Sequence, residues 1–368
     1  VPSKLVALSS TADVLAAALA GTVREVTTGN KITGNVTITD TPTEVELQTI
    51  NNGTTASIQI PAANQAFTAS ASVLAEALTG TVTGPLAAAL SGAVTVNNGA
   101  GTNVAATLLS TIAAGTGGTV TVSAAVNITG DTSEVIAALD TAGVLATTAN
   151  IVLSDTPNVG DLQTLNGKTS GSIKISNGAI TYSGSATVLA AALDGTVTDG
   201  SGNPLSGAMT LTGNPNATQL QTINNATTGN VIIPNAGITL SGTPAVLVEA
   251  LTGSVATSGS AKISGTVTIT TTDPDSAQLK TINDAIDGAI VVPSKAVALS
   301  GTAAALVNAL AGTVTNSSNE KINGTVTITG ANPTEAELKT INDAIDGAID
   351  VPSKLVALSS TADVLAAA

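Results

Sequence analysis

Apolar and polar residues alternate over short runs along this chain, and the segments between these runs carry apolar residues at helical spacing. In the clearest copy, Thr325–Thr329 alternates Thr with Val or Ile, which is typical of a half-buried strand. Leu306, Val307 and Leu310 stand three or four positions apart and predict a helix over Ala303–Ala311. Further strands are expected at Ala296–Leu299, Thr313–Thr315 and Ala348–Val351.

Start and stop signals surround both predicted helices of this copy. Thr302 is a good N-cap for the first helix, and Gly312 stops it. Asn332, Pro333, Thr334 and Glu335 read as N-cap, first-position proline and capping-box carboxylate of a second helix, repeated earlier as Thr41, Pro42, Thr43 and Glu44. Leu338 and Ile341 supply its apolar face, Asn342 is expected to begin its exit, and Asp346-Gly347 is a turn.

The same order of elements recurs at intervals close to 59 residues. Alignment on seven equivalent positions gives successive units of 59, 62, 53, 58, 59 and 59 residues, which sum to 350. The predicted units are 1–60, 61–122, 123–175, 176–233, 234–292 and 293–351, and residues 352–368 begin the next 350-residue repeat. Val351–Ala368 is identical to Val1–Ala18, whereas Val292–Ala309 matches that segment at only 12 of 18 positions. We therefore expect a tandem array with a 350-residue long period and arbitrary ends.

This recurring order of strands and helices predicts an α/β repeat solenoid of stacked βα coils. Each 59-residue unit would contain about two coils, with short helices flanking stacked parallel strands. Neighbouring strands lie about 4.8 Å apart, whereas packed helices need about 8–10 Å between their axes. Two solutions remain open at this point. Successive helices could lie on opposite sides of the strand stack, or all of them could lie on one side of a curved solenoid, as in leucine-rich repeats.

Composition excludes several kinds of chemistry. The 368 residues include 36 Gly but no Cys, His or Trp, and only one Phe, one Tyr and one Met. Thiol nucleophiles, catalytic triads with histidine and structural zinc sites are therefore excluded. A formal charge of −14 argues against nucleic acid as a partner, and no apolar run is long enough to insert into a membrane.

The remaining candidate residues have structural interpretations. The carboxylate pairs Glu44/Glu46 and Glu335/Glu337 are placed for helix capping rather than acid–base catalysis. The recurring Asn-Asp-Ala-Ile-Asp-Gly segments favour helix exits and turns, with calcium as a weaker alternative cofactor; the candidate metal ligands are Asp284, Asp287, Asp343 and Asp346. No residue is assigned to catalysis.

The two aromatic residues are expected in the core. Phe67 and Tyr182 align with Leu240 and Leu299 of other units, so each is interpreted as a core substitution.

Phrases such as Val297-Ala298-Leu299-Ser300-Gly301-Thr302 and Thr327-Ile328-Thr329-Gly330, each followed by a short helix, resemble those of very long tandem-repeat surface proteins of bacteria, including cyanobacteria. The resemblance spans the chain. It implies a secreted coat, fibre or adhesin. Some such proteins also carry calcium-binding β-rolls, whose dense Gly and Asp nonapeptides this sequence lacks.

These observations favour a structural protein over an enzyme: an extracellular filament, sheath or cell-surface stalk formed by stacked repeats. The expected partner is a further copy of the protein, end to end and laterally. The alternative is an adhesin whose solenoid displays a glycan- or surface-binding face, for which the irregular second and third units are the first place to search. A polysaccharide lyase or hydrolase ranks third, because acidic pairs facing one groove would be needed.

Overall fold

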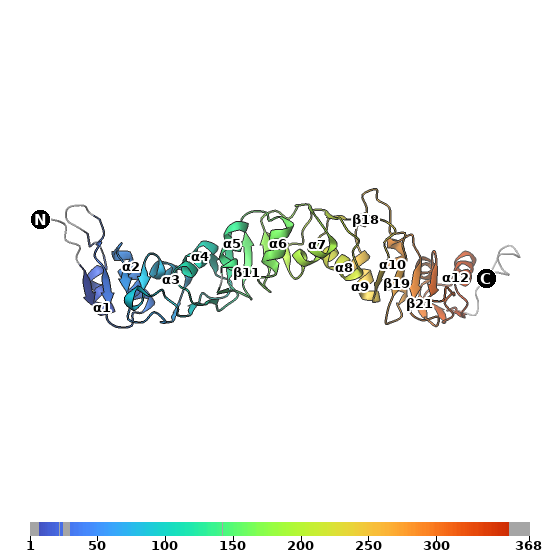
Figure 1. Ribbon diagram of the computed structural model, residues 1–368. Helices are drawn as coiled ribbons and strands as arrows, with labels where there is room; N and C mark the ends of the chain where they lie inside the picture. Colours follow the sequence, from blue (N-terminus) through green and yellow to red (C-terminus); the bar gives the residue numbers. More distant parts are fainter. Residues whose placement is uncertain (1–6, 22, 25–29, 142, 353–368) are drawn as a thin grey trace. The chain divides into compact units, whose positions relative to one another are not determined.

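The computed structural model describes residues 7–21, 23–24, 30–141 and 143–352. Short helices and short strands alternate through this part of the chain (Figure 1). The helices are α1 (Ala12–Leu19), α2 (Glu44–Gly53), α3 (Ala71–Leu78), α4 (Ala106–Ala114), α5 (Thr132–Asp140), α6 (Val159–Asn166), α7 (Ala186–Leu193), α8 (Ala217–Asn225), α9 (Pro244–Leu251), α10 (Ser276–Ala285), α11 (Ala303–Ala309), α12 (Glu335–Ala344) and a 3₁₀ turn (Pro85–Ala87).

Most strands are two or three residues long. They are β1 (Leu8–Ser10), β2 (Val36–Ile38), β3 (Ile58–Gln59), β4 (Phe67–Ala69), β5 (Val82–Thr83), β6 (Val94–Val96), β7 (Asn103–Ala105), β8 (Val120–Val122), β9 (Asn127–Gly130), β10 (Val144–Leu145), β11 (Asn150–Leu153), β12 (Ile173–Ile175), β13 (Tyr182–Gly184), β14 (Val197–Asp199), β15 (Met209–Leu211), β16 (Val231–Ile233), β17 (Leu240–Gly242), β18 (Val255–Thr257), β19 (Val267–Ile269), β20 (Ile290–Val292), β21 (Leu299–Gly301), β22 (Val314–Asn316), β23 (Val326–Ile328) and β24 (Ile349–Asp350).

All pairings between these strands are parallel, as the α/β solenoid prediction requires. Six sheets are formed, with the strand orders β1-β2-β3-β5, β10-β8-β6-β4, β14-β12-β11-β9-β7, β13-β15-β16-β18, β17-β19-β20-β22 and β21-β23-β24. One helix crosses over between each pair of neighbouring strands, so that Leu240 of β17 pairs with Val267 of β19 across α9. Each sequence unit contains the two predicted α-helices, and the last four units contain the four predicted strands; the described residues of the first unit contain three strands, and the second unit contains five.

Two compact units make up the fold. The first contains Val1–Asn177 and Gly195–Gly202, and the second contains Gly178–Asp194 and Asn203–Ala368. In each unit every helix contacts the next one along the chain, from α1 to α6 and from α7 to α12. Helices on opposite sides of a strand stack could not touch their successors. The two-sided arrangement considered from the sequence is therefore wrong, and within each unit the helices form one packed row.

The spacing of strands and helices explains why the sheets are short. Each sheet gains one strand per helix, so the sheet rises about 4.8 Å per step while the helices need about 8–10 Å. In a long continuous sheet, the strands would therefore become increasingly offset from the helices that they should pack against. Each sheet instead has only three to five strands, and the next sheet begins one to three helices after the previous one began and before that one has ended; β21, for example, precedes β22 of the previous sheet.

Small aliphatic side chains fill the core between the helix row and the sheets. In α8, for example, Leu220 and Ile223 are fully buried, and most of the strand positions that face inward are Val, Ile or Leu. Phe67 and Tyr182 are 2% and 3% exposed and begin β4 and β13, so the prediction that both are core residues is confirmed. Burial raises the pKa of Tyr182 to about 12.

Several predicted boundaries are displaced by two or three residues. The first strand of the clearest copy is Leu299–Gly301 rather than Ala296–Leu299, and its helix ends at Ala309. The second helix does have a capping box, but the N-cap is Thr334 and the returning carboxylate is Glu337; Asn332 lies outside the helix. Pro333 precedes the N-cap because the extended backbone before a helix also suits proline.

Candidate functional site: the seams between successive coils

Asparagine side chains connect one helix to the end of the next. We call the surface where a helix and its flanking turns meet the following coil a coil seam. In the seam between α8 and α9, the Asn224 side-chain amide donates to the main-chain oxygens of Glu249 (2.8 Å) and Thr252 (2.5 Å). The same contact recurs from Asn51 to Glu76 O (2.6 Å) and Thr79 O (2.6 Å), and from Asn283 to Asn308 O (2.8 Å).

These contacts satisfy carbonyl groups that a helix cannot satisfy itself. The last four carbonyl oxygens of a helix have no intrahelical partner, and α9 carries no basic side chain in its last turn. Asn is an unfavourable residue inside a helix, so its recurrence in the Thr-Ile-Asn segments of α2, α8, α10 and α12 needs a tertiary reason. Capping the neighbouring helix supplies that reason. Asn342, expected to lie at a helix exit, instead lies inside α12.

A carboxylate adds a second polar contact to two of these seams. Glu249 Oε2 accepts hydrogen bonds from the side-chain amides of Gln221 (2.7 Å) and Asn225 (3.0 Å), both on α8. The first unit repeats this arrangement, with Glu76 Oε2 accepting from Gln48 and Asn52, each at 2.8 Å. Hydrogen bonds from these amides hold the pKa of both carboxyl groups below its usual value.

α10 and α12 carry different charged residues at the corresponding positions. Lys280 pairs with Asp284 on α10, and Lys339 pairs with Asp343 on α12 at 2.5 Å, each one turn apart on its own helix. These residues occupy the positions of Gln48 and Asn52. Lys280 and Asp284 pair with each other on α10, and the helix that follows has no glutamate at the position of Glu249. α11 carries Asn308 there. The seams are therefore not chemically interchangeable.

Helix side chains also cover the open edge of a sheet. The first strand of each sheet has one side without a strand partner, and on β4 the Thr68 N–H points to that side. Glu44 of α2 accepts from this N–H through Oε1 at 2.6 Å, and Ser276 of α10 donates to Ser300 O of β21 at 2.5 Å. An unpaired edge would otherwise be a template for strand addition.

The N-termini of some helices are capped from the following coil. Asp40 Oδ1 accepts from Ala12 N at 2.7 Å, and Asp155 Oδ1 accepts from the main chain of Thr132 at 2.9 Å. Asn98 accepts from Ala71 N at 2.8 Å in the same way. Both ends of a helix thus depend on neighbouring coils.

Glycines lie where main chains of successive coils approach most closely. A Cβ on Gly265, two residues before β19, would lie 2.0 Å from Ile238 O, and one on Gly288 would lie 2.0 Å from Gly265 O. No side chain fits in these places. The same close approach occurs at Gly92, Gly118, Gly171, Gly207, Gly229, Gly324 and Gly347.

The weak calcium candidates are dispersed in these seams. The carboxylates of Asp284 and Asp343 pair with lysines, and the main-chain N–H groups of Asp287 and Asp346 donate to Ile263 O (2.7 Å) and Ile322 O (2.8 Å). Among the residues that the structure describes, no group of three or more acidic side chains could hold a metal ion. Calcium is still only the weaker alternative that the sequence left open.

One carboxylate of each pair at the helix starts has the capping role expected from the sequence, but it is the second residue of the pair rather than Glu44 or Glu335. Glu46 and Glu337 close the capping boxes of Thr43 and Thr334. Glu44 turns away from Glu46 to cover the edge of β4. The two carboxylates of this pair thus serve different contacts.

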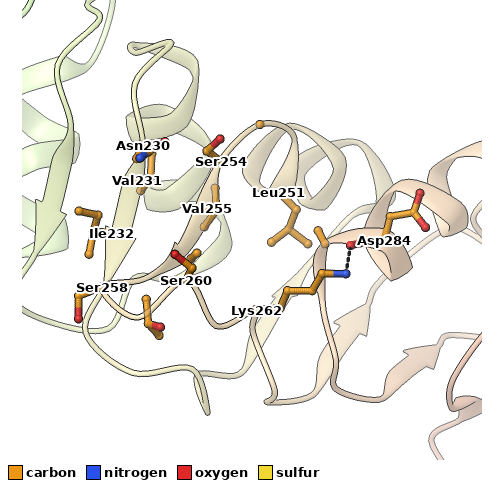
Figure 2. A pocket seen from close by; sticks show the side chains of 14 residues that line it. Asn230, Val231, Ile232, Leu251, Ser254, Val255, Ser258, Ser260, Lys262 and Asp284 are labelled. Atoms are coloured by element: carbon orange, nitrogen blue, oxygen red, sulfur yellow. Dashed lines mark hydrogen bonds between the residues drawn. The ribbon is translucent and has the colours of Figure 1, made fainter.

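Grooves accompany the seams. One of about 400 Å³ lies beside β16 and β18, and Figure 2 shows Val231 and Val255 on one side of it and Lys262 on the other. The Lys262 ammonium donates to Asp284 O at 2.6 Å, drawn as the dashed line. Because the Asp284 carboxylate is paired with Lys280, this groove offers no acid and base aimed at one point.

Two further grooves are near-copies of each other. They measure about 320 Å³ and 370 Å³ and are built around Glu76 and Glu249, respectively. Positions 173 residues apart line both of them: Asn51/Asn224, Asn52/Asn225, Thr54/Thr227, Thr55/Thr228, Glu76/Glu249, Thr79/Thr252, Gly80/Gly253 and Thr81/Ser254.

Comparison with known protein families and with curated proteins finds no match to this sequence. No helix in the described ranges is long and apolar enough to cross a membrane, as expected from the sequence. The capping role of the seam asparagines and the close contacts of the glycines were not predicted from the sequence. Both could have been found from their fixed places in the repeat, after Thr-Ile and two residues before a strand.

Proposed function

We propose that this chain is a structural element of an extracellular filament, sheath or cell-surface stalk that is built by stacking solenoid coils. The observation that supports this most strongly is the repeated seam: helix ends, strand edges and close-packed glycines are completed by the neighbouring coil at successive steps. A coil of this kind gains stability only next to another, so the structure is suited to extension.

The composition fits a durable exterior material. The chain has no Cys to oxidise and a single Met, and only 10% of its residues are charged. The long-period identity of Val351–Ala368 with Val1–Ala18 further supports an array in which the same sequence is used again.

The test is to purify the protein and examine it by cryo-electron microscopy, with a mass measurement under denaturing conditions. Filaments with a regular axial repeat are expected, and the denatured mass distinguishes one giant chain from stacked short ones. Discrete particles at all concentrations would contradict the proposal.

A second candidate function is an adhesin that binds glycans, and the near-identical grooves at Glu76 and Glu249 favour it. They present amides, hydroxyls and a carboxylate, the groups that bind sugar hydroxyls, at two equivalent places. Titration calorimetry with a panel of oligosaccharides tests this function. Two equivalent sites that are lost in the Glu76→Gln/Glu249→Gln variant would support it, and no heat from any glycan would argue against it.

A further inference from the structure

Three helices of the first unit are capped at their N-termini by a residue that follows a strand of a later coil. Asp40, Asn98 and Asp155 each stand two residues after a strand, namely β2, β6 and β11. The Oδ1 atom of each accepts the main-chain N–H of the first helical residue, and Asn98 accepts from Ala71 N at 2.8 Å. The chain therefore uses two carboxylates and one amide for the same contact.

The amide lies at the helix with the least negative charge near its N-terminus. α1 has Asp13 in its first turn and α5 has Glu134, in addition to their capping carboxylates. The first turn of α3 holds no acidic residue, and within the described residues its N-cap Ser70 makes no side-chain capping hydrogen bond. Because the positive end of a helix favours a negative charge, a carboxylate would suit α3 better than the amide of Asn98.

The residue after Asn98 can convert this amide. Asn98 is followed by Gly99, whereas Asp40 and Asp155 are followed by Thr. The main-chain nitrogen of a glycine can attack the side-chain carbonyl carbon of a preceding Asn, since no side chain obstructs the approach. Gly99 is exposed, and a Cβ there would have no neighbour within 4 Å. None of the described residues accepts a hydrogen bond from the Gly99 N–H, so the attacking nitrogen is accessible.

The capping contact also activates the carbon that is attacked. Negative charge develops on Oδ1 of Asn98 when the nitrogen adds to Cγ. This oxygen already accepts the N–H of Ala71 at the positive end of α3. A donor held at the oxygen that becomes charged stabilises the transition state, so the contact favours the reaction as well as the helix.

Three of the other Asn-Gly pairs are held in ways that oppose the same attack. Asn52-Gly53 lies inside α2, and the glycine of Asn166-Gly167 donates its N–H back to a main-chain oxygen of α6 at 3.1 Å. The glycine of Asn323-Gly324 is packed against the preceding coil, where a Cβ would lie 2.1 Å from a main-chain oxygen. Asn98-Gly99 combines an open glycine with an activated amide.

We propose that Asn98 is a self-modification site, at which Gly99 converts the side-chain amide to a carboxylate. The Gly99 nitrogen forms a bond to Asn98 Cγ and loses its proton, while the Cγ–Nδ2 bond breaks and Nδ2 leaves with that proton as ammonia. A five-membered succinimide ring results. Water then opens the ring, its hydroxyl group adding to a ring carbonyl carbon and its proton to the Gly99 nitrogen. Addition at Cγ gives aspartate, and addition at the main-chain carbon gives isoaspartate.

The structure favours aspartate as the product. The oxygen on Cγ is the one that accepts the Ala71 N–H, which activates Cγ toward water. Aspartate also leaves the length of the main chain unchanged and retains the cap, so that position 98 would carry the residue type of Asp40 and Asp155. This inference goes beyond the proposed function and is independent of whether the chain forms filaments.

Ageing of the purified protein at mildly alkaline pH tests the proposal. Aged samples are digested with pepsin in acid, which suppresses further deamidation. Mass spectrometry with electron-transfer fragmentation then locates each product and separates aspartate from isoaspartate. We expect Asn98 to react before Asn52, Asn166 and Asn323. We also expect a larger aspartate fraction at position 98 in the folded protein than in protein aged in urea.

Gly99→Ala is the matched control, since the added Cβ meets no neighbour and Gly99 has no positive φ. Circular dichroism should show an unchanged fold, and deamidation of Asn98 should be lost over the same ageing time. An unchanged rate in this variant, equal rates at Asn98 and Asn323, or the same product ratio in folded and urea-treated protein would overturn the proposal.

Asn98→Asp tests the consequence for α3 without the ageing step. The urea midpoint of this variant should lie above that of freshly prepared unsubstituted protein, because the capping atom then carries a negative charge. A lower midpoint would show that a carboxylate does not suit this cap, and it would also overturn the proposal.

Discussion

Replacing Gly265 by alanine should destabilise the second unit, because the added Cβ has no room. It would lie 2.0 Å from Ile238 O, whereas real Cβ atoms keep at least 3.0 Å from such neighbours, so the two main chains must separate by about 1 Å. The affected segments lead directly into β17 and β19, which are joined by the hydrogen bond from Leu240 N to Thr266 O at 3.1 Å. Part of this ladder has to move as well.

The magnitude follows from two opposing terms. Forcing extra volume into a close-packed site costs about 1–3 kcal/mol, and Gly→Ala returns about 0.4–1 kcal/mol by restricting the unfolded chain. The net expectation is a loss of about 1–2 kcal/mol, which corresponds to a melting temperature roughly 2–8 °C lower for a unit of this size.

Gly213→Ala is the matched control. A Cβ at Gly213 has no neighbour within 4 Å, and the residue has no positive φ. This variant should be neutral or stabilised by up to about 1 kcal/mol. Both variants are compared by urea unfolding followed by circular dichroism. If Gly265→Ala unfolds at the same urea concentration as Gly213→Ala, the close approach of successive coils does not limit side-chain size and the argument is wrong.

Three further outcomes are expected. Asn224→Ala leaves carbonyl oxygens at the end of α9 without their donor and should cost about 1–2 kcal/mol in urea unfolding, while Asn214→Ala at an exposed position should cost little. The folded pKa of Glu76 and Glu249 lies below the usual 4.5, so their contribution to the free energy of unfolding is present above pH 4.5 and is lost as the pH falls through the folded pKa. In the Glu76→Gln/Glu249→Gln variant, the urea midpoint should therefore decline less over this acidic range than in the unsubstituted protein. Tyr182, the only tyrosine, should ionise at about pH 12 when folded and near pH 10 in denaturing urea, as measured by absorbance at 295 nm; a native value near 10 would contradict its burial.

Local rules accounted for the elements better than for their ends. Alternation and helical spacing located the strand and helices of the clearest copy, and Thr302 is the N-cap expected from its residue type. The capping box was found, but its N-cap is Thr334 rather than Asn332, since both positions carry residues that can cap and only the packing of Leu338 and Ile341 fixes the register. For the same reason the strand expected at Ala296–Leu299 begins only at Leu299.

The amino-acid sequence by itself determined the repeat, the α/β class, the parallel coils and the buried places of Phe67 and Tyr182, because these follow from periodicity and residue type. Only the tertiary structure decided that successive helices touch and that Asn224 caps another helix. Only it showed that Gly265 lies against a carbonyl group. These are contacts between residues more than 20 positions apart, and their partners depend on how one coil is placed on the next, which no local pattern encodes.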